Sequence, residues 1–77
     1  MSIIDARGLL CPLPVLRLQK RLRALPPGAT VTLQATDPAA VIDVPHFCNQ
    51  SGHELVAQTA VDEGVTEYTV RRGPDRG

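Results

Sequence analysis

Two cysteines and two histidines are the residues of this chain best suited to nucleophilic or metal chemistry, and Cys11 has the most informative surroundings. Cys11 is followed by Pro12, Leu13 and Pro14. Proline is tolerated in the first turn of an α-helix, where its missing N–H has no intrahelical partner. The two prolines therefore predict a helix start and place Cys11 at or next to the N-cap. The free N–H of Leu13 and the positive end of the helix dipole would then point toward the sulfur.

This position favours a thiolate at Cys11. Cysteines at helix N-termini commonly titrate below the free value of about 8.5. A thiolate is the nucleophile that attacks an enzyme-bound persulfide, and the same donors would stabilise the anionic persulfide that results. Arg7 would add positive charge if it pointed the same way. The alternative is a structural role for Cys11, as a small apolar residue packed under a strand–helix turn.

The other candidate residues have structural explanations. Cys48 lies on an apolar helix face and is predicted to be a core residue, with a resolving thiol as the alternative. His46, Cys48 and His53 match no zinc-ligand spacing, and the chain has no Cys-x-x-Cys. We therefore expect no metal and no cofactor. Asp37 is predicted to cap the second helix, and Asp5 to bond to the turn after the first strand.

Hydrophobic periodicity predicts six elements, in the order strand, helix, strand, helix, strand, strand. Their ranges are 2–6, 12–25, 30–36, a second helix that begins at Asp37-Pro38, 54–61 and 65–71. The stripe expected to be buried on the first helix is Val15, Leu18, Leu22 and Leu25, broadened by Leu16. The stripe on the second helix is Val41, Val44 and Cys48, with Pro45 expected to kink or restart that helix.

This order of elements predicts an α/β fold, a two-layer sandwich with both helices on one face of the sheet, because strand–helix–strand crossovers are right-handed. The parallel strands should end at one edge, where both helices begin, so Cys11 and Asp37 should share that edge. α/β proteins usually bind or react there. Polar residues expected to face water on the other side of the sheet are Thr32, Gln34, Glu67 and Thr69. A single domain should span residues 1–72, followed by a flexible tail at 73–77.

Charge and composition restrict the partners. The formal net charge is zero, but basic residues gather in the first third of the chain. Arg17, Lys20 and Arg21 on the first helix are candidates for docking a partner protein, with a solvated helix face as the alternative. One Phe and one Tyr provide few stacking platforms, which argues against direct nucleic-acid binding. The chain has no apolar run of membrane-spanning length and no secretory signal, so a cytoplasmic protein is expected.

Several segments in order resemble the TusA/SirA-like (YhhP-like) sulfur carrier family. The stretch DARGLLCPLPVL is similar to the family's Cys-Pro-x-Pro signature after a short strand. The resemblance continues through a Pro-Gly loop, a Thr-Asp-Pro helix start, an Asp-x-Pro-x-Phe-Cys segment and a Gly-His-Glu-Leu strand entry, and covers roughly residues 3–72.

The resemblance implies a four-stranded mixed sheet in the order 1-2-4-3, and a persulfide on the motif cysteine, Cys11. It implies a sulfurtransferase whose donor is a cysteine desulfurase or a rhodanese-like protein and whose acceptor is another protein. Family members serve tRNA 2-thiouridine synthesis, sulfur oxidation or molybdenum cofactor supply. Leu13 departs from the Cys-Pro-Glu-Pro of members in tRNA thiolation, which leaves the pathway open. The remaining alternative is a non-catalytic regulatory or interaction domain.

Overall fold

The computed structural model describes residues 2–74 and contains two helices and four strands in the predicted order. The elements are β1 (Ser2–Ala6), α1 (Leu13–Arg23), β2 (Thr30–Ala35), α2 (Ala40–Ser51), β3 (Glu54–Asp62) and β4 (Val65–Arg71). Met1 and the last three residues of the expected tail lie outside the described part of the chain.

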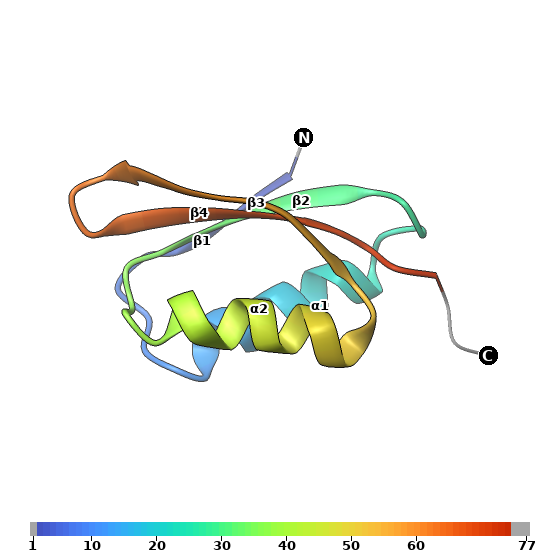
Figure 1. The fold of residues 1–77 in the computed structure, drawn as a ribbon, viewed down its shortest axis with the longest axis horizontal. Helices are drawn as coiled ribbons and strands as arrows, with labels where there is room; N and C mark the ends of the chain where they lie inside the picture. The colour runs from blue at the N-terminus through green and yellow to red at the C-terminus, as the bar shows by residue number, and fades with distance from the viewer. Residues whose placement is uncertain (1, 75–77) are drawn as a thin grey trace.

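The four strands form one mixed sheet in the order β1-β2-β4-β3, which confirms the expected order. β1 and β2 are parallel, and β4 is antiparallel to both β2 and β3. Figure 1 shows the sheet as one layer and both helices as a second layer on the same face. The fold is therefore the predicted two-layer α/β sandwich.

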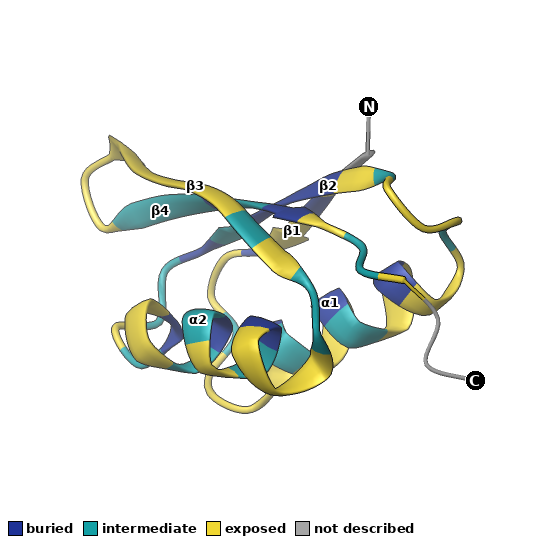
Figure 2. Ribbon diagram, turned by 45° about the vertical axis from the view of Figure 1, so that its right-hand side comes forward, coloured by how far each residue is buried: buried dark blue, intermediate teal, exposed yellow. Residues whose placement is uncertain are grey.

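The core lies between the sheet and the sides of the helices that face it, as the dark segments in Figure 2 show. Leu18 and Leu22 of α1 are buried, as are Val44 and Cys48 of α2. Two residues assigned to the buried stripes are not in the core: Leu16 is 49% exposed and Val41 is 45% exposed. The predicted apolar stripes are therefore too wide at these two positions. Pro14 and Ala40, smaller residues nearer the sheet, occupy the buried positions instead.

The face of the sheet opposite the helices is less exposed than predicted. Thr32 is only 9% exposed, and Gln34, Glu67 and Thr69 are half-buried. Gln34 Nε2 donates a hydrogen bond of 2.8 Å to Glu67 Oε2 on the neighbouring strand. Thr32 is shielded because β2 is an interior strand, flanked by β1 and β4. Cross-strand neighbours therefore cover its side chain.

The helix boundaries differ from the prediction at both helices: α1 spans Leu13–Arg23 instead of 12–25. α2 begins at Ala40, so Pro38 lies in the preceding turn instead of the first helical turn. The prediction that Asp37 caps this helix is wrong, because the N-cap is Ala39. The Asp37 side chain instead organises the preceding turn, because its Oδ1 accepts the Ala39 N–H at 3.1 Å. Pro45 does not restart the helix, which runs unbroken to Ser51. Burial of Val44 and Cys48 on the sheet offsets the single hydrogen bond that proline removes.

The residues after β4 are anchored to the helical layer. Arg72 Nε donates to the Leu22 carbonyl at the end of α1 at 2.8 Å, a favourable place for a cation. The Gly73 N–H donates to His53 Nδ1 at 2.9 Å. A Cβ at position 73 would clash with the Gly52 carbonyl oxygen, so only glycine fits there. The ordered part of the chain therefore reaches at least Gly73, the first residue of the expected tail.

Candidate functional site

Cys11 lies directly before Pro12, the N-cap of α1, which confirms the position predicted from the two prolines. Its backbone N–H donates to Asp37 Oδ2 at 2.6 Å. The starts of the two helices are thus joined at the carboxyl edge of the parallel strands, as expected. Gly8, whose N–H donates to Thr36 Oγ1 at 2.8 Å, provides a second link between the two connecting loops.

The Cys11 thiol faces a carboxylate. Cys11 Sγ donates a hydrogen bond of 2.8 Å to Asp43 Oδ2, on the first turn of α2. This contact was not predicted from the sequence. The signal available for it was the shared edge: a polar residue in the first turn of α2 must lie near the start of α1.

The electrostatics at Cys11 are the reverse of the prediction. The hydrogen bond to Asp43 raises the pKa of Cys11, and desolvation and the charges of Asp43 and Asp37 raise it further. The Leu13 N–H expected to reach the sulfur donates instead to the Leu10 carbonyl at 2.9 Å. The thiol is therefore held as a neutral hydrogen-bond donor, because two nearby carboxylates disfavour the thiolate.

Arg7 does not offset these carboxylates, because it pairs with Asp5. Its Nε and Nη2 donate to the two Asp5 carboxylate oxygens at 2.9 and 3.0 Å. These hydrogen bonds lower the pKa of Asp5 to about 2. Asp5 also accepts the Arg7 backbone N–H at 3.1 Å, which confirms its predicted role in the turn after β1.

A surface hollow of about 290 Å³ adjoins the Cys11 thiol. It lies between the start of α1 and α2, and its lining residues are Cys11, Pro12, Val15, Asp43, His46, Phe47 and Gln50. Apolar walls and a few polar groups suit a small, polarisable substituent on the sulfur. The hollow is open to the surface, so a group attached to Cys11 stays within reach of a second protein.

Three exposed apolar side chains are close in sequence to Cys11 or to Asp43. Leu10 is 70% exposed, Leu13 is 47% exposed, and Ile42, next to Asp43, is 74% exposed. We call these three residues the apolar collar. Large exposed aliphatic side chains beside a reactive group are typical of surfaces that meet other proteins.

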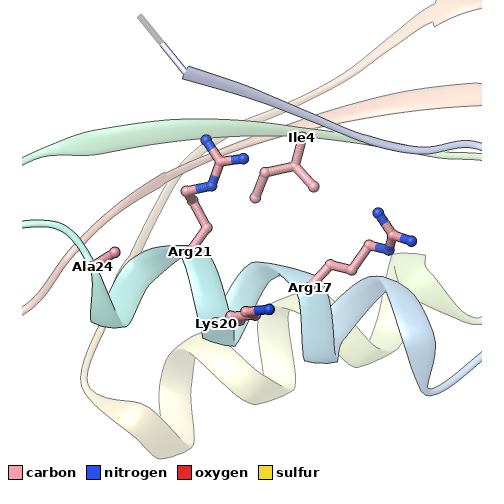
Figure 3. A pocket seen from close by; sticks show the side chains of 5 residues that line it. All are labelled: Ile4, Arg17, Lys20, Arg21 and Ala24. Atoms are coloured by element: carbon pink, nitrogen blue, oxygen red, sulfur yellow. The ribbon is translucent and has the colours of Figure 1, made fainter.

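The basic residues predicted to dock a partner line a separate groove. Arg17, Lys20 and Arg21 are all exposed, and with Ile4 and Ala24 they line a space of about 510 Å³ between α1 and the edge strand β1. Figure 3 shows Arg17 and Arg21 reaching toward β1 on either side of Ile4. The three basic side chains thus line one groove, and their role in docking a partner remains a prediction.

Cys48 is a core residue, as predicted. Its side chain is 2% exposed, it forms no disulfide, and burial raises its pKa to about 11.

His53 accepts a hydrogen bond from the Gly73 N–H and makes a ring contact with Phe47. Within residues 2–74, no three His, Cys, Asp or Glu side chains gather as a metal site would require. None of the helices described is long and apolar enough to span a membrane.

Comparisons with known proteins agree on one family. The sequence model described as "Sulfurtransferase TusA" matches residues 2–72. A "Sulfur carrier protein TusA" of Pseudomonas savastanoi pv. phaseolicola is 45% identical over 74 residues, which are 96% of this chain and 87% of that protein. One from Pseudomonas syringae pv. syringae is 46% identical over 72 residues, 94% of this chain and 84% of the relative.

A solved structure gives the same answer. The crystal structure of a SirA-like protein from Desulfitobacterium hafniense superposes with a TM-score of 0.84 at 31% sequence identity. The match covers 96% of this chain and all of the solved one (100%). By sequence and by fold, the chain belongs to the TusA family.

Proposed function

We propose that this protein is a cytoplasmic sulfur carrier that holds a sulfur atom as a persulfide on Cys11. The observation that carries the proposal is the contrast in access: of the chain's two cysteines, Cys11 is exposed and Cys48 is buried. The names of the relatives indicate that the transferred group is sulfur, since these proteins are called sulfur carriers. The exposed cysteine is the one group of the chain that can bond covalently to sulfur and still meet another protein.

The transfer makes the chain a sulfurtransferase whose active group is regenerated in each cycle. Cys11 Sγ attacks the outer sulfur of a donor persulfide, and the bond between that sulfur and the donor cysteine breaks. Its electron pair leaves with the donor sulfur, which takes up the proton lost from Cys11. No oxidant is needed. An acceptor thiol then attacks the same outer sulfur and returns Cys11 to its thiol form.

The donor is a cysteine desulfurase or a rhodanese-like protein, and the acceptor is a second protein. Delivery toward tRNA thiolation is one route, and sulfur oxidation and molybdenum cofactor supply are the others. The apolar collar provides exposed apolar area on segments next to Cys11 and Asp43. The groove of Arg17, Lys20 and Arg21 provides charge that speeds and orients the encounter. Neither surface is large, which suits a carrier that must release each partner.

The proposal is tested by loading the protein with sulfur. The purified chain is incubated with a cysteine desulfurase and cysteine, and its intact mass is measured under non-reducing conditions. We expect one added sulfur atom, mapped to Cys11 by peptide analysis, and none in Cys11→Ser. Sulfur gain by folded Cys11→Ser would contradict the assignment. A folded wild-type protein that gains no sulfur from any donor would favour the interaction-domain alternative.

A further inference from the structure

A carrier thiol that donates a hydrogen bond to a carboxylate is an unexpected arrangement, and it suggests a role for Asp43. An anionic neighbour opposes formation of the thiolate, which is the form that attacks. The Cys11 Sγ–Asp43 Oδ2 distance of 2.8 Å puts the carboxylate in direct contact with the reacting atom. Asp43 is half-buried, so water screens this interaction less than it would a fully exposed pair.

The groups around Cys11 provide little compensation. Among the described residues, Asp37 from the loop before α2, and Asp43 and His46 from α2, are the titratable groups at this position. Asp37 is occupied by the Cys11 and Ala39 backbone N–H groups. His46 is exposed on the rim of the hollow and forms no hydrogen bond in the described structure. Asp43 is therefore the carboxylate that contacts the sulfur itself.

We propose that Asp43 restrains Cys11: it keeps the unloaded thiol protonated and weakens the carrier's hold on an anionic persulfide. This inference rests on the proposed persulfide role of Cys11. The unloaded thiol is stabilised because it donates its proton to the carboxylate. A persulfide is a stronger acid than a thiol, so the loaded form is more often an anion, which the same carboxylate repels. Both effects favour the unloaded state and hence delivery.

The exchange of sulfur between loaded Cys11 and glutathione can be measured at equilibrium. When glutathione takes the sulfur, its sulfur atom bonds to the outer sulfur and the bond from that sulfur to Cys11 Sγ breaks. The electron pair of the broken bond stays on Sγ. Sγ takes the proton released by glutathione and again donates to Asp43 Oδ2. Nothing is oxidised or reduced overall, so the loaded fraction at equilibrium reports the relative stability of the two forms.

The first test is the pH dependence of Cys11 alkylation by iodoacetamide in the Asp43→Asn protein. Asparagine keeps the shape of the side chain and removes the charge, so the pKa of Cys11 should fall. The thiolate fraction at pH 7 should rise, although lower nucleophilicity cancels about half of the gain on a logarithmic scale. We expect alkylation to be faster by about threefold or more at pH 7, with the whole profile displaced to lower pH.

The second test is the loaded fraction at equilibrium with glutathione and glutathione persulfide at pH 7, measured by intact mass. Asp43→Asn should raise the ratio of loaded to unloaded protein by about threefold or more. Asp43→Glu, which restores a carboxylate, should move both readouts back toward wild type. Glu54→Gln removes a carboxylate that pairs with Arg71 at 2.8 Å and has no contact with Cys11. It should leave both readouts unchanged.

The outcomes distinguish failure of the proposed Asp43 role from failure of the proposed sulfur-carrier function. A coincident pH profile, slower alkylation of Asp43→Asn, or an unchanged loaded fraction would overturn the role of Asp43 while the wild type still carried sulfur on Cys11. Failure of the wild type to carry sulfur on Cys11 would instead overturn the proposed function. Circular dichroism establishes that each variant is folded, and Cys48 does not contribute to the alkylation signal if the core stays closed.

Discussion

The two cysteines of this chain differ chiefly in access: Cys11 precedes α1, and Cys48 lies within α2. Cys11 is exposed before α1, and Cys48 is buried on the side of α2 that faces the sheet. Both have a raised pKa, but hydrogen bonding to Asp43 is the main cause at Cys11 and burial is the cause at Cys48. A raised pKa therefore does not identify an inert cysteine in this fold. Exposure and the neighbouring groups decide what each thiol can do.

The largest expected effect is the difference in reactivity between these thiols in the native protein. Cys11 should react with iodoacetamide without unfolding, whereas Cys48 should react only when the core opens. A domain with a free energy of unfolding of ~5 kcal/mol is globally open less than once in about 1,000 times. We expect Cys48 to be alkylated at least about 1,000-fold more slowly, measured by peptide mass spectrometry over time.

Denaturation and pH provide the controls for this difference. In concentrated urea both cysteines should react at similar rates, because burial and the Asp43 contact are lost together. In native buffer the Cys11 rate should keep rising with pH beyond the usual thiol range, because the pKa of Cys11 is raised. Rapid native alkylation of Cys48 would show that α2 does not shield it.

The contrast also shows what the sequence could and could not reveal. The order of elements and the position of Cys11 next to the N-cap follow from hydrophobic periodicity and from Pro12 and Pro14, which are local signals. The shared edge of Cys11 and Asp37 follows from the topology of parallel strands. The protonation state of the Cys11 thiol could not be predicted from the sequence, because it depends on which hydrogen-bond donors and acceptors the loops bring together. The Leu13 N–H is taken by Leu10, and Asp43 approaches from the other helix.

A smaller effect should appear when the charge of the groove beside α1 is reversed. Arg21 lines the groove and Arg23, two residues later, does not. Arg21→Glu should slow loading by a desulfurase several-fold, about threefold to tenfold at low salt, because surface charge mainly affects encounter. The effect should fade as salt rises, since the screening length is about 10 Å at 0.1 M. Initial rates of sulfur gain by intact mass give the measurement.

Arg23→Glu is the matched control, with the same change of charge on the same helix. Its loading rate should stay close to that of wild type. Reaction of Cys11 with neutral iodoacetamide should be equal in all three proteins, because the groove does not include the thiol. Equal slowing by Arg21→Glu and Arg23→Glu would indicate a general effect of net charge, and equal loading rates would support the solvated-face alternative.

The smallest effect on sulfur transfer is expected from Cys48→Ala. Loading of Cys11 should persist at the wild-type rate, because the buried thiol does not contact the site. Stability should fall, because the substitution removes a buried sulfur from a side chain that is 2% exposed. We expect a loss of about 1–2 kcal/mol in the free energy of unfolding by urea, within the lower range for buried truncations.

Cys11→Ala provides the reciprocal comparison, since the same substitution at the exposed position should change stability by less than about 0.5 kcal/mol while abolishing loading. The two alanine variants would thus separate chemistry from packing: one loses sulfur transfer and keeps its stability, and the other does the reverse. Loss of loading in a folded Cys48→Ala protein would contradict this division. It would mean that α2 opens during the cycle and that Cys48 acts as a resolving thiol, so the two cysteines would form a relay.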